Sequence, residues 1–223
     1  MSAGKRITSM HFTVKAILAK FFLEQDKFNR IKKFIVILGF LSVVCIGCFI
    51  CCLKYRKINE ASSEKLTEAC IACNKGNWQK GITILDETII KFRKTPAAYQ
   101  ARLIKADIFT ELRAYNDALQ ILSEIISNGK PDVIKPLASA RIIYIYDLKK
   151  DYFNAILASK EFIDKYSDHF LVKDIYFNLA EYYLLSGSKD QAMKIFNEVL
   201  LNFPATEEAE KAKDRLNSIK QRG

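Results

Sequence analysis

The chain has few residues of the kinds that catalysis most often requires. Its 223 residues include only two histidines, His11 and His169, which lie on opposite sides of a long apolar run and therefore cannot pair. The sequence has no glycine-rich phosphate loop, no His-Glu-x-x-His motif and no serine nucleophile elbow. Its Asp and Glu residues are scattered, as is typical of solvated helix surfaces. We therefore expect a protein that is not an enzyme, without catalytic residues, cofactor or metal.

Cysteine is equally sparse outside one segment. The chain has six cysteines, and four of them lie in the apolar run, where a thiol behaves as a small hydrophobic group: Cys45, Cys48, Cys51 and Cys52. The other two, Cys70 and Cys73, have the spacing of a redox or metal half-site, but no second pair and no thioredoxin-like βαβ pattern accompanies them. We place both in mid-helix, away from a helix N-terminus that would lower a thiol pKa. They are interpreted as structural thiols, with a thiol oxidoreductase as the alternative.

Residues 34–53 form an uninterrupted apolar run of 20 residues without a charged side chain. A helix of that length spans roughly 30 Å, the thickness of the hydrocarbon core of a bilayer. The run therefore predicts a transmembrane helix over 34–53. A cleavable signal peptide fits poorly, because 33 residues precede the run. The triplet Ile46-Gly47-Cys48 leaves a lipoprotein cleavage site as a weaker alternative.

The net charge of +10 is concentrated before the apolar run, since residues 1–33 hold eight Lys or Arg and two acidic residues. Next to a bilayer this excess indicates topology, not nucleic-acid binding. Six cations precede the run closely and four follow it, which favours a cytoplasmic N-terminus. We predict a single-pass protein of the inner membrane with its C-terminal domain in the periplasm. The tail 1–33 is either an amphipathic helix, with the apolar residues of 10–21 on one face, or a poorly ordered segment.

The region after the run repeats with a period of 37 residues. Several columns stay small or apolar through four copies. Two of these columns are Gly81, Ala118, Ala155, Ala192, and Ala69, Ala106, Ile143, Ala180. Apolar residues within each copy recur at helical spacing, and Ser186-Gly187-Ser188 marks a turn between two helices. Each copy is therefore a helix–turn–helix hairpin.

The last copy has the pattern Tyr176-x2-Leu179-Ala180-x2-Tyr183-x3-Gly187-x4-Ala192-x3-Phe196-x2-Val199-x4-Pro204. This pattern resembles a tetratricopeptide repeat. The resemblance covers about residues 62–206 and implies an α-solenoid. The period of 37, rather than the family's 34, implies longer connections.

The predicted fold is all-α: an N-terminal transmembrane helix, then an α-solenoid of about four hairpins in a domain over 58–223. The expected helices are 58–75 and 78–93, 97–112 and 115–128, 133–148 and 152–166, 170–186 and 189–202. A final helix, 206–220, is expected to cap the last hairpin.

The tetratricopeptide resemblance also implies a binding groove lined by the first helix of each hairpin. The positions carried over as the partner-binding groove are Leu103, Asp107, Tyr144, Asp147, Phe177, Glu181 and Leu184, with Leu66, Cys70, Cys73 and Thr110 beside them. They lack the Lys/Arg pair that holds a peptide carboxylate in some relatives. An acidic, partly apolar groove suits a basic or amphipathic segment of another protein. The alternative is that Leu103 and Phe177 only pack between hairpins.

The whole arrangement resembles the single-span ancillary subunit of the bacterial Sec translocon. That resemblance implies a non-enzymatic scaffold between the translocon and a periplasmic chaperone, with other proteins as partners. The repeats, with residues 201–207 leading into the last helix, also resemble periplasmic tetratricopeptide proteins of envelope assembly and cell division. Those proteins are lipoproteins or fully secreted.

Overall fold

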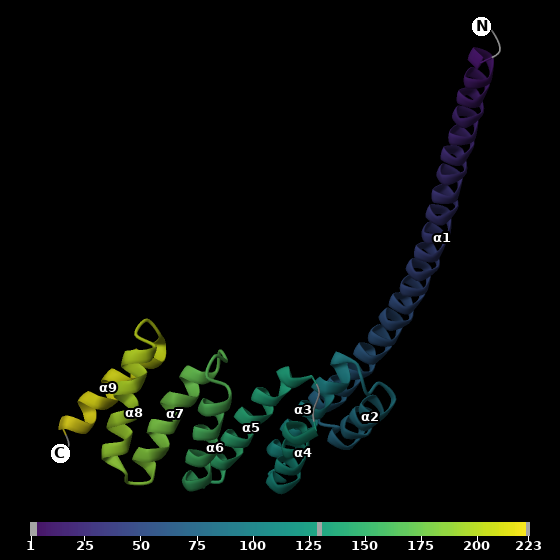
Figure 1. Ribbon diagram of the computed structural model, residues 1–223. Helices are drawn as coiled ribbons and strands as arrows, with labels where there is room; N and C mark the ends of the chain where they lie inside the picture. Colours follow the sequence, from purple (N-terminus) through teal and green to yellow (C-terminus); the bar gives the residue numbers. More distant parts are fainter. Residues whose placement is uncertain (1–3, 129–130, 222–223) are drawn as a thin grey trace. The chain divides into compact units, whose positions relative to one another are not determined.

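The computed structural model describes residues 4–128 and 131–221, with side chains from residue 38 onward. The chain divides into two compact units, Met1–Ile58 and Asn59–Gly223, which are treated separately. All regular structure in the described ranges is helical (Figure 1). The all-α prediction is confirmed.

Helix α1 (Gly4–Asn74) contains the apolar run, and its described part is long and apolar enough to cross a membrane. The separate helix predicted over 58–75 is wrong, because α1 continues through residues 54–58 without a break. The reason is local: Lys54-Tyr55-Arg56-Lys57-Ile58 contains no proline or glycine that would end a helix. The predicted amphipathic face of residues 10–21 lies outside the residues whose side chains are described.

The second unit is a row of antiparallel helices in which each helix packs on the next (Figure 1). The end of α1 is the first helix of the first hairpin. The elements that follow are α2 (Trp78–Lys91), α3 (Pro96–Glu111), α4 (Tyr115–Asn128), the 3-10 turn η1 (Asp132–Ile134), α5 (Lys135–Leu148), α6 (Tyr152–Lys165), α7 (Val172–Leu185), α8 (Lys189–Asn202) and α9 (Glu207–Gln221). The predicted bounds of these helices agree to within two residues.

The 37-residue columns form the core. Every member of the two columns given above is buried, and all but Ile143 are small: Gly81, Ala118, Ala155, Ala192, and Ala69, Ala106, Ile143, Ala180. Small side chains there let the two helices of a hairpin approach closely, and larger side chains such as Leu122 and Phe196 fill the adjacent space. Four clusters of buried residues follow one another along the row, so each hairpin is stabilised by its neighbours.

The turn inside each hairpin uses one left-handed residue at the same repeat position. These residues are Gly76 (φ 77°), Arg113 (φ 59°), Lys150 (φ 56°) and Gly187 (φ 84°). Glycine takes this conformation at no steric cost, whereas the Cβ atoms of arginine and lysine oppose it. In the second and third hairpins, the packing of the two helices therefore compensates the steric cost of the left-handed turn residue.

Candidate protein-binding site

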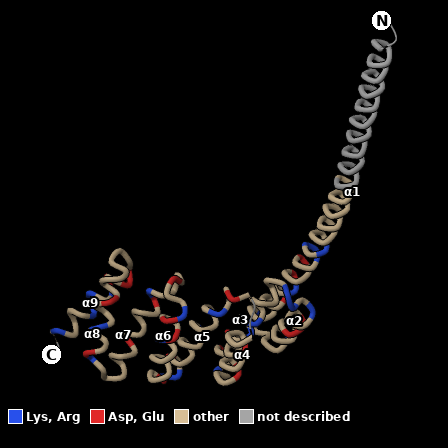
Figure 2. The backbone as a smooth tube through the Cα atoms, viewed as in Figure 1, with Lys and Arg blue, Asp and Glu red and all other residues tan. Residues whose placement is uncertain are grey.

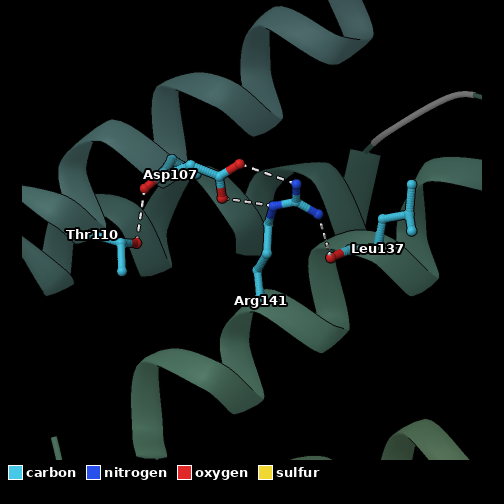
Figure 3. Close-up of polar contacts among 5 residues, drawn as sticks. Asp107, Thr110, Leu137 and Arg141 are labelled. Carbon is cyan, nitrogen blue, oxygen red and sulfur yellow. Dashed lines mark hydrogen bonds and ion pairs between the residues drawn. The ribbon is translucent and has the colours of Figure 1, made fainter. Parts of the chain in front are cut away.

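Two carboxylates of the predicted groove bind arginines on the next first helix. Asp107 of α3 accepts two hydrogen bonds from Arg141 of α5, at 2.7 Å from Nε and 3.0 Å from Nη2 (Figure 3). The same guanidinium donates to the carbonyl of Leu137 at 3.2 Å. This bidentate geometry fixes the arginine and orients α5 against α3.

An ion pair recurs two repeats later, but Glu181 Oε1 accepts no hydrogen bond in the described part of the chain. Arg215 of α9 lies 2.8 Å from Glu181 of α7, and both pairs join residues 34 positions apart. The side chain of Glu181 is only 20% exposed, so its charge is balanced at a largely covered position. Helix α9 thus occupies the place of a first helix in a fifth repeat, in agreement with the predicted cap.

Asp147 of α5 is the groove carboxylate with no hydrogen bond or ion pair in the described part of the chain. Burial raises its pKa. It lies near Tyr182, whose own pKa is raised first by burial and then by the Asp147 charge. Of the three carboxylates predicted in the groove, Asp107 and Glu181 each pair with an arginine and Asp147 does not. A cation of a partner protein could therefore bind Asp147 without displacing an arginine.

The predicted apolar groove residues divide between core and surface. Leu103 is buried in the cluster formed by α3, α4 and α5. The ring of Phe177 packs 5.6 Å from that of Phe196, and Leu184 is half-buried in the same cluster. Tyr144, in contrast, is 53% exposed. Leu103 therefore packs between hairpins, whereas the ring contact of Phe177 is with α8 of its own hairpin.

Two exposed leucines were missed by the sequence analysis. Leu148 lies one helical turn after Tyr144 on α5, and Leu185 of α7 lies 37 residues after Leu148 at the equivalent repeat position. Both side chains are exposed. We call Tyr144, Leu148 and Leu185 the apolar row. The signal that could have found it is the i, i+4 spacing from Tyr144 combined with the repeat period.

Cys70 and Cys73 lie in the last two turns of α1, so their predicted mid-helix position is wrong, although they remain far from a helix N-terminus. Cys73 is buried, and burial raises its thiol pKa, with the Cys70 charge adding to the rise. A nucleophilic thiol needs a shift in the opposite direction. In the ranges with described side chains, no three His, Cys, Asp or Glu residues are grouped so as to hold a metal ion.

The comparisons with known proteins agree with this geometry. Residues 174–206 match the tetratricopeptide repeat family model. A tetratricopeptide repeat protein from Parabacteroides merdae superposes with a TM-score of 0.57 at 12% identity, covering 73% of this chain and 61% of that one. A Podosopora anserina protein with nearly identical TPR-like repeats gives 0.53 at 13% identity, covering 71% and 85%.

The fold is that of a tetratricopeptide-repeat protein. The tetratricopeptide solenoid extends beyond the matched repeat, since the solved structures superpose on most of the chain. The chain spans 61% of the length of the Parabacteroides merdae protein. No curated protein matches the sequence. At 12% and 13% identity these likenesses define the fold alone.

Proposed function

We propose that the chain is a non-enzymatic, membrane-anchored scaffold whose first helices bind a segment of another protein. The observation that carries this proposal is the apolar row on two successive first helices of a tetratricopeptide solenoid. Exposed aromatic and aliphatic side chains at repeated positions are typical of a protein-binding surface. The exposed side chains of the apolar row on α5 and α7 suit contact with an extended or helical segment of a partner protein.

The chemistry of this surface differs from a simple acidic groove. Arg141 and Arg215 balance the charges of Asp107 and Glu181, so Asp147 beside the apolar row is the carboxylate available to a partner. We infer that the partner segment presents apolar side chains together with one Lys or Arg. Such a segment satisfies Asp147 and covers Tyr144 and Leu148 at once.

The finer proposal is that this scaffold links the Sec translocon to periplasmic chaperones of exported proteins. It is supported by the order of a basic tail, one span and a tetratricopeptide solenoid. The alternative is an adaptor of envelope assembly or cell division. Detecting residues 1–33 in the mature protein would favour the translocon proposal, because the proteins of the alternative are lipoproteins or fully secreted.

Photo-crosslinking tests the binding surface directly. A benzophenone amino acid at position 144, in membranes of the source cell, should yield a discrete crosslinked protein. The matched control is position 153 on second helix α6, where Phe153 is 71% exposed but lies outside the first helices. Adding Asp147→Arg should abolish the crosslink from position 144 while helix content is unchanged. Equal crosslinking from positions 144 and 153, or no effect of Asp147→Arg, would count against the proposal.

A double cysteine variant separates the scaffold proposal from the thiol oxidoreductase alternative. If the thiols are structural, as the raised pKa of the buried Cys73 suits, Cys70→Ser/Cys73→Ser should keep its crosslinks and its mobility on non-reducing gels. Loss of function in this variant, with the solenoid still folded, would revive the redox alternative.

A further inference from the structure

The end of α2 and the loop that follows it combine an exposed apolar side chain with three cations. Ile90 is 72% exposed at the end of α2, and Lys91, Arg93 and Lys94 follow it with exposed side chains. In Figure 2, Lys and Arg are coloured blue along this part of the fold. The amphipathic surface formed by residues 90–94 has no role in the protein-binding site described above.

The register of the first hairpin places this loop beside the start of the second unit. A Cβ built on Gly81 would overlap the sulfur of Cys73, and Gly76 forms the turn between them. Antiparallel helices keep that register, so residues 90–94 lie level with residues 60–64 at the end of α1 that begins the unit. Four carboxylates lie nearby: Glu60 and Glu64 in that stretch, and Asp86 and Glu87 on α2, of which Asp86 pairs with Lys105. The cations that favour an anionic surface are therefore those of residues 90–94 together with the basic residues just before the unit.

The chain connects this edge to the apolar run by a short segment. Only residues 54–58 separate Leu53 from Asn59, and even fully extended they reach about 20 Å. Three of these five residues are Lys54, Arg56 and Lys57. If residues 34–53 cross a bilayer, Asn59 at the start of the second unit therefore lies within about 20 Å of the end of the run.

We propose that residues 90–94 bind the surface of a bilayer that contains anionic lipids, with Ile90 inserted among the headgroups and the three cations bound to phosphates. The proposal rests on the membrane anchor of the proposed function. Each cation near an anionic leaflet is attracted to it, and salt weakens this attraction. This contact would hold the first hairpin on the membrane and leave α5 and α7 for the partner.

The repeat offers a matched position at which the contact should be absent. Leu201 at the end of α8 occupies the same repeat position as Ile90 and is 79% exposed. It lies three hairpins farther along the row, next to the acidic start of α9. If exposure alone determined contact with lipid, positions 90 and 201 would behave alike. The proposal predicts lipid contact at position 90 and none at position 201.

Fluorescence quenching by brominated lipids tests the proposal, because the chain has a single tryptophan. Trp78 lies at the opposite end of α2 from the loop and serves as the reference. The full chain is reconstituted in vesicles of equal parts phosphatidylcholine and phosphatidylglycerol, and Ile90→Trp or Leu201→Trp is introduced with Trp78→Phe. Quenching at position 90 should exceed that at positions 78 and 201 several-fold. It should fall to their level with Lys91→Glu/Arg93→Glu/Lys94→Glu, at high salt, or in phosphatidylcholine alone.

Flotation of the same vesicles separates the two possible failures. A chain that does not float lacks the proposed span. A chain that floats but shows no more quenching at position 90 than at position 78 overturns the lipid contact alone. That second result would leave an acidic protein as the ligand of the loop.

Discussion

Gly81 is the residue at which the first hairpin departs from the alanine of the other three. The space that a methyl group would take is filled by Cys73, and the Ala69 carbonyl lies 3.4 Å from the same point. The sequence shows that glycine replaces alanine at this repeat position, but it does not show why. The side chain that requires the glycine, Cys73, lies on another helix and at another repeat position.

Replacing Gly81 therefore tests this packing. Gly81→Ala should lower the free energy of unfolding by about 1–3 kcal/mol, as overpacked cores do. In a Cys73→Ala background the same change should raise it, because alanine favours the helix by about 1 kcal/mol over glycine. A double-mutant cycle by urea unfolding measures the coupling, and additive effects would contradict the packing.

The left-handed residues of the turns give a second prediction at this scale. Arg113→Gly and Lys150→Gly should each stabilise the fold by about 0.5–1 kcal/mol, because glycine removes the steric cost of a positive φ. The reverse change, Gly187→Ala, is the control and should destabilise by a similar amount. Thermal unfolding followed by circular dichroism measures all three, and no gain from either glycine would show that these turns carry no strain.

At the scale of elements, α9 is attached to the last hairpin by a buried ionic cluster. Glu208 is buried at the start of α9 and lies 3.0 Å from Lys173 of α7. Burial opposes its ionisation, but hydrogen bonds from its backbone, Lys173 and Asp174 lower its pKa to about 2, below the ordinary 4.5. Burial and the Glu208 carboxylate raise the pKa of Asp174 in turn.

The lowered pKa predicts a stability that depends on pH. The contribution of Glu208 is present above pH 4.5 and is lost as the pH falls toward 2, because in this range the unfolded state takes up a proton and the folded state does not. Glu208→Gln should therefore cost about 1–3 kcal/mol at neutral pH and much less at pH near 3. The control is Glu207→Gln, whose exposed carboxylate pairs with Lys211, and it should change stability little. Equal losses for the two variants in urea unfolding would contradict the buried cluster.

The helices themselves were predictable because the hydrophobic period, the turn glycines and the repeat all specify the same bounds. The continuous α1 was not foreseen, because the interpretation divided the chain where its composition changes and not where the backbone has a reason to stop. The Asp107–Arg141 and Glu181–Arg215 pairs were also missed. Both depend on how tightly successive first helices pack, which spacing along the chain does not give.

At the scale of the molecule, the proposed function assigns attachment to the first unit and binding to the second. The first unit carries the apolar run, and the second carries the repeats, the apolar row and Asp147. The central claim is that the run crosses a membrane once and holds the whole solenoid on the far side from the N-terminus. Charge asymmetry around the run supports this orientation, but the cluster at residues 54–57 opposes it.

Protease accessibility in spheroplasts tests that claim most directly, with separate tags at the two ends of the full chain. External protease should remove the C-terminal tag and the repeats, while the N-terminal tag survives on a short fragment that resists carbonate extraction. Survival of the C-terminal tag, or release of the intact chain by carbonate, would contradict it.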